Sequence, residues 1–104
     1  MGSFFSKLFG GSQQPDFKAL MSQGALIIDV RTQSEFQNGH LRGSQNIPLD
    51  RVQSRVSELK KKNKPVITVC MSGSRSRMAE GILRRAGVEA YNGGPWFRLE
   101  SRLS

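Results

Sequence analysis

The sequence predicts an α/β fold in which a small central parallel sheet lies between helices on both faces, in three α/β/α layers. Two short apolar runs rich in β-branched residues, 25–30 and 66–69, have the composition of strands that are buried on both faces. Segments with apolar residues at helical spacing lie between and after these runs. Strands that alternate with helices in a chain of 104 residues indicate βαβ crossovers around a core of one domain.

The first elements expected along the chain are a helix over 15–23 and the strand over 25–30. Gly24, between them, suits the left-handed residue that ends many helices. Asp29 and Arg31 fall at the carboxyl end of the strand, and ligands of parallel sheets bind beyond that end. The apolar residues that share one face of the helix are Phe17, Leu20 and Met21.

A second, shorter helix and an edge strand come next. Thr32 and Glu35 have the spacing of a capping box, which predicts a helix over 33–38. Residues 47–48 are expected to form only a short edge strand, because Pro48 has no N–H to give to the ladder of a central strand.

The second half of the chain is expected to contain an amphipathic helix over 50–61, the strand over 66–69 and a helix over 74–86. The strand delivers Cys70 at its carboxyl end, and Gly87 ends the helix that follows. The residues expected to face the core are Val52, Val56 and Leu59 in the first helix and Met78, Ile82 and Leu83 in the second.

The C-terminal part is expected to form a last strand over 88–91, a turn over 92–95 and a short amphipathic helix. The turn is predicted from the Asn-Gly-Gly-Pro composition. Trp96 begins the terminal helix, and we expect its indole to pack in the core rather than to line a pocket.

Charge and cysteine content limit the classes of ligand. Sixteen Lys and Arg residues against eight Asp and Glu give a formal net charge of +8, which favours anionic ligands. The basic run over 60–64 ends a predicted helix, where cations oppose the negative end of the dipole, so a solvated helix terminus explains it. No zinc-finger or RNA-binding signature accompanies the charge, so nucleic-acid binding is not expected. With one cysteine the chain has no internal disulfide, and we predict no metal and no cofactor.

Residues 1–13 are predicted to form a flexible or amphipathic tail before a domain over 14–104. No apolar run approaches the roughly 18 residues that span a bilayer, and no signal-peptide pattern is present, so a cytoplasmic location is expected. Residues 1–10 combine four apolar side chains with one lysine, which leaves weak peripheral contact with a membrane as an alternative to a frayed tail. The four side chains are Phe4, Phe5, Leu8 and Phe9.

The segment from Cys70 to Arg75 is a strand-to-helix turn that can hold an anionic sulfur. Gly73 can take a backbone conformation closed to other residues, so the turn can curl round the sulfur. Backbone N–H groups in such a turn form a nest for an anion, and the following helix adds the positive end of its dipole. Arg75 is the nearest obvious fixed charge, and Ser74 and Ser76 are expected to donate to sulfur or to cap the helix.

These features favour the thiolate of Cys70 over the thiol, whose pKa is ordinarily near ~8.5. A thiolate held by amide donors can attack a sulfane donor, keep the outer sulfur as a persulfide and pass it to a second nucleophile. We therefore predict ping-pong sulfur transfer. The residues expected to contact the substrate are Met71, Ser72, Gly73, Ser74, Arg75 and Ser76.

The motifs of this chain, taken in order, resemble those of rhodanese homology domains. The resemblance covers Asp16 to the C-terminus and implies an α/β fold with Cys70 as the nucleophile of a loop that runs to Arg75. The six-residue loop has the length of the sulfurtransferases, whereas related cell-cycle phosphatases have one residue more. The matching motifs are 26–32, Glu35-Phe36, Gly39-His40, Gly43, 46–48, Cys70, Gly73, Arg75-Ser76, 86–88, 92–94 and Trp96.

The resemblance also implies the partners. The donor is expected to be a small sulfur-containing anion such as thiosulfate, or a persulfide or polysulfide. The acceptor is expected to be cyanide or a thiol, from glutathione, thioredoxin or another protein, and the chain is expected to be a monomer. The family's thiosulfate enzymes often have a basic residue directly after the cysteine, and Met71 departs from that pattern.

Other interpretations stay open at this point. The chain can instead be a non-enzymatic interaction, sulfur-carrier or redox-sensing module, or an adaptor attached to a membrane by its tail. A thiol-dependent arsenate reductase is less favoured, because the chain lacks a second cysteine. Asp29 and Arg31 are expected to fix loops near the sheet edge rather than to shape the mouth of the substrate pocket, and His40 to bond backbone rather than to act as a general base.

Overall fold

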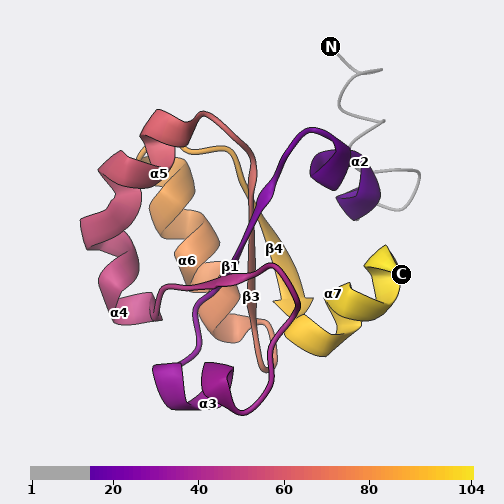
Figure 1. Ribbon diagram of the computed structural model, residues 1–104. Coiled ribbons are helices and arrows are strands. Elements are labelled where there is room, and N and C mark those ends of the chain that lie inside the picture. The colour runs from indigo at the N-terminus through magenta and orange to yellow at the C-terminus, as the bar shows by residue number, and fades with distance from the viewer. Residues whose placement is uncertain (1–14) are drawn as a thin grey trace.

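The computed structural model describes residues 15–104 and shows helices on both faces of a parallel sheet (Figure 1). The four strands lie in the order β2-β1-β3-β4, so β1 and β3 are central. The predicted α/β fold with its three layers is confirmed. The predicted tail and its membrane contact lie outside the described residues. The strands are β1 (Leu26–Asp29), β2 (Gln45–Asn46), β3 (Val66–Cys70) and β4 (Ala90–Pro95).

The helices divide between the two faces of the sheet (Figure 1). Helices α4 (Leu49–Val52), α5 (Val56–Lys62) and α6 (Ser74–Arg85) cover one face, and a 3-10 turn, η1 (Gln53–Arg55), joins α4 to α5. Helices α2 (Phe17–Ser22) and α7 (Trp96–Leu103) cover the other face. Helix α3 (Gln33–Gln37) follows the carboxyl end of β1.

Each face of the sheet has its own core, because successive side chains of β3 point to opposite sides. Val66 and Cys70 lie in the core under α4, α5 and α6, whereas Ile67 and Val69 lie in the core under α2 and α7. All five residues of β3 are buried, as expected for a central strand. The helix side chains buried in the first core are Val52, Leu59, Ala79 and Leu83, and those in the second are Phe17, Leu20 and Leu99.

Several local signals form as the sequence predicts. The hydroxyl of Thr32 accepts from the amide of Glu35, whose carboxylate accepts from the amide of Thr32, so the capping box begins α3. Gly24 and Gly87 have φ angles of +87° and +89°, which suit the residues that end α2 and α6. The edge strand lies at Gln45–Asn46, two residues before the predicted 47–48.

The predicted helix over 50–61 is interrupted at η1. There the hydroxyl of Ser54 donates to the carbonyl of Arg51 at 2.8 Å. Such a local side-chain bond competes with the regular helical pattern. Val52 and Leu59 are nevertheless buried, so the apolar face survives the change in winding.

The inward prediction for Met78 is wrong: this side chain is 59% exposed. Helix α6 buries Leu83 as predicted, but it also buries Ser76 and Ala79, so its inner face is rotated away from Met78 toward two positions that the apolar pattern did not select. The rotation follows from a polar contact, because the Ser76 hydroxyl lies 3.3 Å from the sulfur of Cys70.

The predicted turn over 92–95 is wrong, because these residues belong to β4. Thr68 of β3 is opposite Asn92 and Val69 is opposite Gly94, so Gly93 is the extra residue of a β-bulge. A Cβ at Gly93 would lie 2.8 Å from Cγ2 of Ile67 and 3.0 Å from the carbonyl oxygen of Thr68. Only glycine fits there, and the bulge sets the position of Asn92.

Candidate active site

Cys70 lies at the carboxyl end of central strand β3, opposite Pro95 of β4. Helix α6 begins four residues after Cys70, and Gly73, with a φ of +102°, turns the backbone from the end of the strand into the helix. The residue has no exposed surface, so the loop covers the sulfur in this conformation. A nucleophile in this position is shielded from bulk water.

The sulfur of Cys70 is surrounded by hydrogen-bond donors. The amide of Gly73 donates to it at 3.0 Å and the amide of Ser76 at 3.4 Å, and the Ser76 hydroxyl lies 3.3 Å away. Burial raises the pKa of the Cys70 thiol, but the Ser76 hydroxyl and the amides of Ser76, Gly73 and Ser72 lower it by more. The net result is a pKa below the ordinary cysteine value, which increases the thiolate fraction at neutral pH.

The serines of the loop do not act alike. Ser76 is fully buried beside the sulfur, whereas the side chains of Ser72 and Ser74 are exposed and their hydroxyls lie 3.4 Å from each other. No side chain caps the start of α6, whose N-cap is Gly73. The expectation of a hydroxyl near the sulfur therefore holds for Ser76, and capping by a serine does not occur.

Arg75 is not a free cation beside the sulfur. Its guanidinium makes two hydrogen bonds to the Glu35 carboxylate, at 2.7 and 3.0 Å, and so joins the start of α6 to α3. The hydrogen bond from Arg75 and the amide of Thr32 lower the pKa of Glu35 to about 2. The sequence identified Glu35 as part of a capping box and of a family motif, and nothing in the spacing indicated its contact with Arg75.

We expect Glu35→Gln to weaken the contact with Arg75 without removing the cap of α3, because glutamine also fits a capping box. The pair is about one-third exposed, so the loss is about 1 kcal/mol or less at neutral pH. Since the pKa of Glu35 is lowered, its contribution is complete above the unfolded value of 4.5 and disappears as pH falls toward about 2. Urea unfolding of both proteins at pH 7 and pH 2.5 measures the difference.

Glu58→Gln is the matched control for that comparison. It breaks an exposed pair with Arg55 that makes no contact with the loop. Both variants lose one carboxylate, so a change in the Cys70 alkylation rate with Glu35→Gln alone would identify Arg75 as the group affected. A stability difference between native protein and Glu35→Gln that is larger at pH 2.5 than at pH 7 would contradict the assignment.

Asp29 and Arg31 form a buried ion pair at the end of β1, with side chains 0% and 2% exposed. The Arg31 guanidinium makes three hydrogen bonds to the carboxylate, the shortest at 2.7 Å, and another to the carbonyl of Gly39 at 2.7 Å. It also lies 5.0 Å from the ring centroid of Trp96. These contacts fit the expected structural role of both residues.

The contacts of His40 and Trp96 also match what the sequence predicts. The His40 ring is 2.7 Å from the carbonyl oxygen of Phe36 and stacks on the Phe36 ring, as expected for a histidine that bonds backbone. Trp96 packs against the core under α2 and α7, which confirms the expectation of a core role.

Asn92 is a site residue that the sequence analysis missed, because it was assigned to a turn. Its side-chain oxygen accepts from the Ser76 hydroxyl at 2.6 Å and from the amide of Gly94 at 2.9 Å. Its side-chain nitrogen donates to the carbonyl of Gly73 at 3.1 Å. Asn92 thus connects β4 to the loop around the sulfur.

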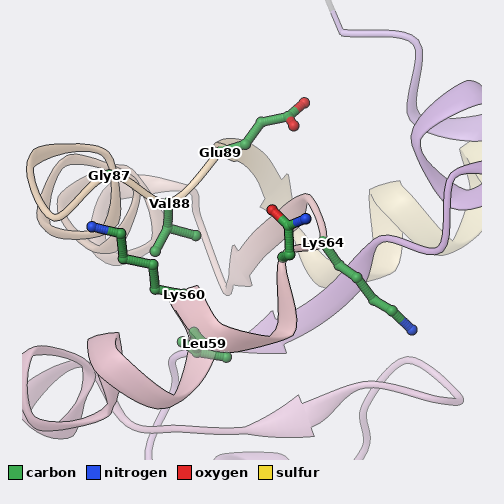
Figure 2. Close-up of a pocket in the computed structure, with 7 residues that line it drawn as sticks. Leu59, Lys60, Lys64, Gly87, Val88 and Glu89 are labelled. Atoms are coloured by element: carbon green, nitrogen blue, oxygen red, sulfur yellow. The ribbon is translucent and has the colours of Figure 1, made fainter.

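A pocket of about 260 Å³ lies near the starts of β3 and β4 (Figure 2), whereas Cys70 lies at the other end of β3. Lys64 and Glu89 line it; Lys64 lies two residues before the start of β3, and Glu89 directly precedes β4. Lys60, Lys61 and Lys62 lie in the last turn of α5, which is the helix terminus expected for the basic run, and the ammonium of Lys60 also lies near Gly87, after the end of α6. Across residues 15–104, no cluster of His, Cys, Asp and Glu could hold a metal ion, and no helix is long and apolar enough to cross a membrane.

Comparisons with known proteins agree with the geometry. The chain is 32% identical over 82 residues to the thiosulfate sulfurtransferase GlpE of Pseudomonas fluorescens, covering 74% of this chain and 72% of GlpE. It is 38% identical over 63 residues to the putative sulfur carrier protein YrkF of Bacillus subtilis, covering 61% of this chain and 34% of YrkF. In two other curated relatives, from Bacillus subtilis and Escherichia coli, the match spans 54% and 50% of the relative's length.

A solved structure has the same fold. It is a rhodanese with anions from Escherichia coli, with a TM-score of 0.64 and 33% identity, covering 70% of this chain and 88% of that chain. The family model of the rhodanese-like domain matches residues 13–94. The parallel sheet, the cysteine loop and this match together show that the chain belongs to the rhodanese-like domain family.

Proposed function

We propose that this domain is a sulfurtransferase in which Cys70 carries sulfane sulfur as a persulfide. The observation that carries the proposal is the set of donors on a buried sulfur: the amides of Gly73 and Ser76 point at Cys70 and its pKa is lowered. Relatives of the family include a thiosulfate sulfurtransferase, which supports this reaction class.

The reaction has two steps that share the Cys70 sulfur. In the first, the thiolate attacks the outer sulfur of the donor; a Cys70 S–S bond forms and the donor's S–S bond breaks. With thiosulfate, sulfite leaves with the electron pair. In the second, cyanide or an acceptor thiolate attacks the outer sulfur, and Cys70 leaves again as a thiolate. The amide donors stabilise the anion before and after each step.

The loop favours a persulfide or polysulfide donor over thiosulfate. A dianion such as thiosulfate gains most from uncompensated cations, and the Arg75 guanidinium is already paired with Glu35. The residue after the nucleophile is Met71, an apolar and 47% exposed side chain. We therefore propose that thiosulfate is a slow donor for this domain and that a small-molecule persulfide, a protein persulfide or a polysulfide loads it faster.

A sulfur carrier is the second candidate. The sulfur of Cys70 has no exposed surface, and one relative is a putative sulfur carrier protein. A carrier accepts sulfur but releases it only to its own partner. An enzyme turns over with glutathione, cyanide or thioredoxin as acceptor.

Intact-mass spectrometry tests the proposal directly. The native protein is treated with thiosulfate, a glutathione persulfide or a polysulfide, and then with cyanide. We expect a gain of one sulfur atom that cyanide removes. Protein alkylated beforehand serves as the control, because Cys70 is the only cysteine. If none of the three donors adds sulfur, the proposal is wrong. Stable loading without release to small acceptors would favour the carrier.

A further inference from the structure

A chain of three polar side chains runs from the nucleophile to strand β4. The Ser76 hydroxyl lies 3.3 Å from the sulfur of Cys70 and 2.6 Å from the side-chain oxygen of Asn92. Ser76 is fully buried, so water cannot replace either contact from outside. The Ser76 hydroxyl is therefore shared between the Cys70 sulfur and the Asn92 side-chain oxygen.

The backbone fixes which end of the Asn92 amide faces Ser76. The amide of Gly94 is a donor and must meet the side-chain oxygen, and the carbonyl of Gly73 is an acceptor and must meet the side-chain nitrogen. A flipped amide would place donor against donor and acceptor against acceptor. The oxygen of Asn92 therefore faces Ser76, and in this structure the Ser76 hydroxyl donates its hydrogen to that oxygen.

This assignment limits what Ser76 can do for the sulfur. A serine hydroxyl has one hydrogen and accepts with its lone pairs. While that hydrogen is on Asn92, Ser76 can only accept from Cys70, and this suits the neutral thiol. A thiolate has no hydrogen to give, so it gains from Ser76 only when the hydroxyl turns toward sulfur and leaves Asn92.

We propose that Asn92 is a positioning residue that competes with the Cys70 sulfur for the hydrogen of Ser76 and so sets how readily the nucleophile ionises. In the resting thiol the order of donation is Cys70 to Ser76 to Asn92. In the thiolate Ser76 donates to sulfur, and the oxygen of Asn92 keeps only the amide of Gly94. The proposal deepens the proposed function, since it concerns the same sulfur.

The charged side chains on the elements around Cys70 are the same in all the variants that test the proposal. Arg75 of α6 is paired with Glu35 of α3, and Glu80 of α6 accepts from the backbone amide of Asn92 at 3.0 Å. Asp29 and Arg31 at the end of β1 pair with each other. None of these side chains is changed in the variants below.

The test is the rate of iodoacetamide alkylation against pH for reduced native protein, Asn92→Ala, Ser76→Ala and the double variant. The single cysteine makes the alkylated site unambiguous. With Ser76 present, we expect Asn92→Ala to lower the pKa of Cys70 by roughly half to one unit, a three- to tenfold rise in the thiolate-to-thiol ratio. In the Ser76→Ala background the same change should produce no shift.

Two results would overturn the proposal. Equal shifts with and without Ser76 would mean that Asn92 acts by anchoring Gly73 and Gly94 rather than through the hydroxyl. No shift, or an upward shift, with Ser76 present would mean that the two groups do not compete.

Asn92→Asp provides a second comparison if Asn92→Ala does not fold. The carboxylate keeps the shape and holds the hydroxyl more strongly, so the pKa of Cys70 should rise further with Ser76 present than in the Ser76→Ala background. Equal rises would reflect charge alone and count against competition. The titration uses no sulfur donor, so its outcome is independent of whether a persulfide forms.

Discussion

Cys70→Ser is expected to abolish sulfur transfer, with a fall in rate of roughly a thousandfold or more, because the residue is the only thiol of the chain. A serine hydroxyl does not ionise at neutral pH, so the amide donors that favour the thiolate of Cys70 have no anion to stabilise in the variant. The variant should also gain no sulfur in the mass spectrum. Thiocyanate or hydrogen sulfide release measures the rate.

The fold should survive this change, because serine is close to cysteine in size and Ser76 offers a hydrogen-bond partner beside it. The unfolding transition of Cys70→Ser should therefore stay cooperative. Lys61→Ser is the activity control, because Lys61 is an exposed residue of α5 and lies outside the loop around the sulfur. Persistent transfer by folded Cys70→Ser would show that the reaction does not pass through a cysteine persulfide.

Arg31→Ala is expected to cause the largest loss of stability, about 3–5 kcal/mol. The change removes the three hydrogen bonds of the guanidinium to Asp29 and leaves a carboxylate with no exposed surface. Breaking one side of a buried ion pair has this magnitude, because the remaining charge cannot reach water. Against a typical total of about 5–15 kcal/mol, the variant should unfold at a clearly lower urea concentration.

Arg55→Ala is the matched control for that experiment. It removes the same side chain from a pair with Glu58 whose members are 34% and 48% exposed. Exposed pairs contribute little to stability, because water screens them, so the urea midpoint should hardly move. Equal losses in the free energy of unfolding from Arg31→Ala and Arg55→Ala would show that the buried pair with Asp29 stabilises the fold no more than an exposed pair does.

The regular elements could be predicted from short-range patterns. The run over 25–30 contains β1, the run over 66–69 lies in β3, the capping box begins α3, and Gly24 and Gly87 follow α2 and α6. These signals act within a few residues of the chain, so they do not depend on the rest of the fold. The position of Cys70 between a buried strand and a helix follows from the same reasoning.

The errors occur where distant segments decide the local structure. Met78 was expected inside because it is apolar, but Ser76 takes the inner face of α6, where it contacts the sulfur. Residues 92–95 have turn composition, yet pairing with β3 and the bulge at Gly93 hold them in β4. Propensity is a weak predictor where such long-range pairing exists.

The sequence by itself determined the fold class, the family resemblance and the nucleophile, because periodicity, caps and the single cysteine are properties of neighbouring residues. Only the tertiary structure decided which groups surround the sulfur. Glu35 meets Arg75 across 40 positions, and Asn92 meets Ser76 across 16. The physical reason is that hydrogen bonds of this kind depend on the packing of separate elements round one strand end, which no local pattern specifies.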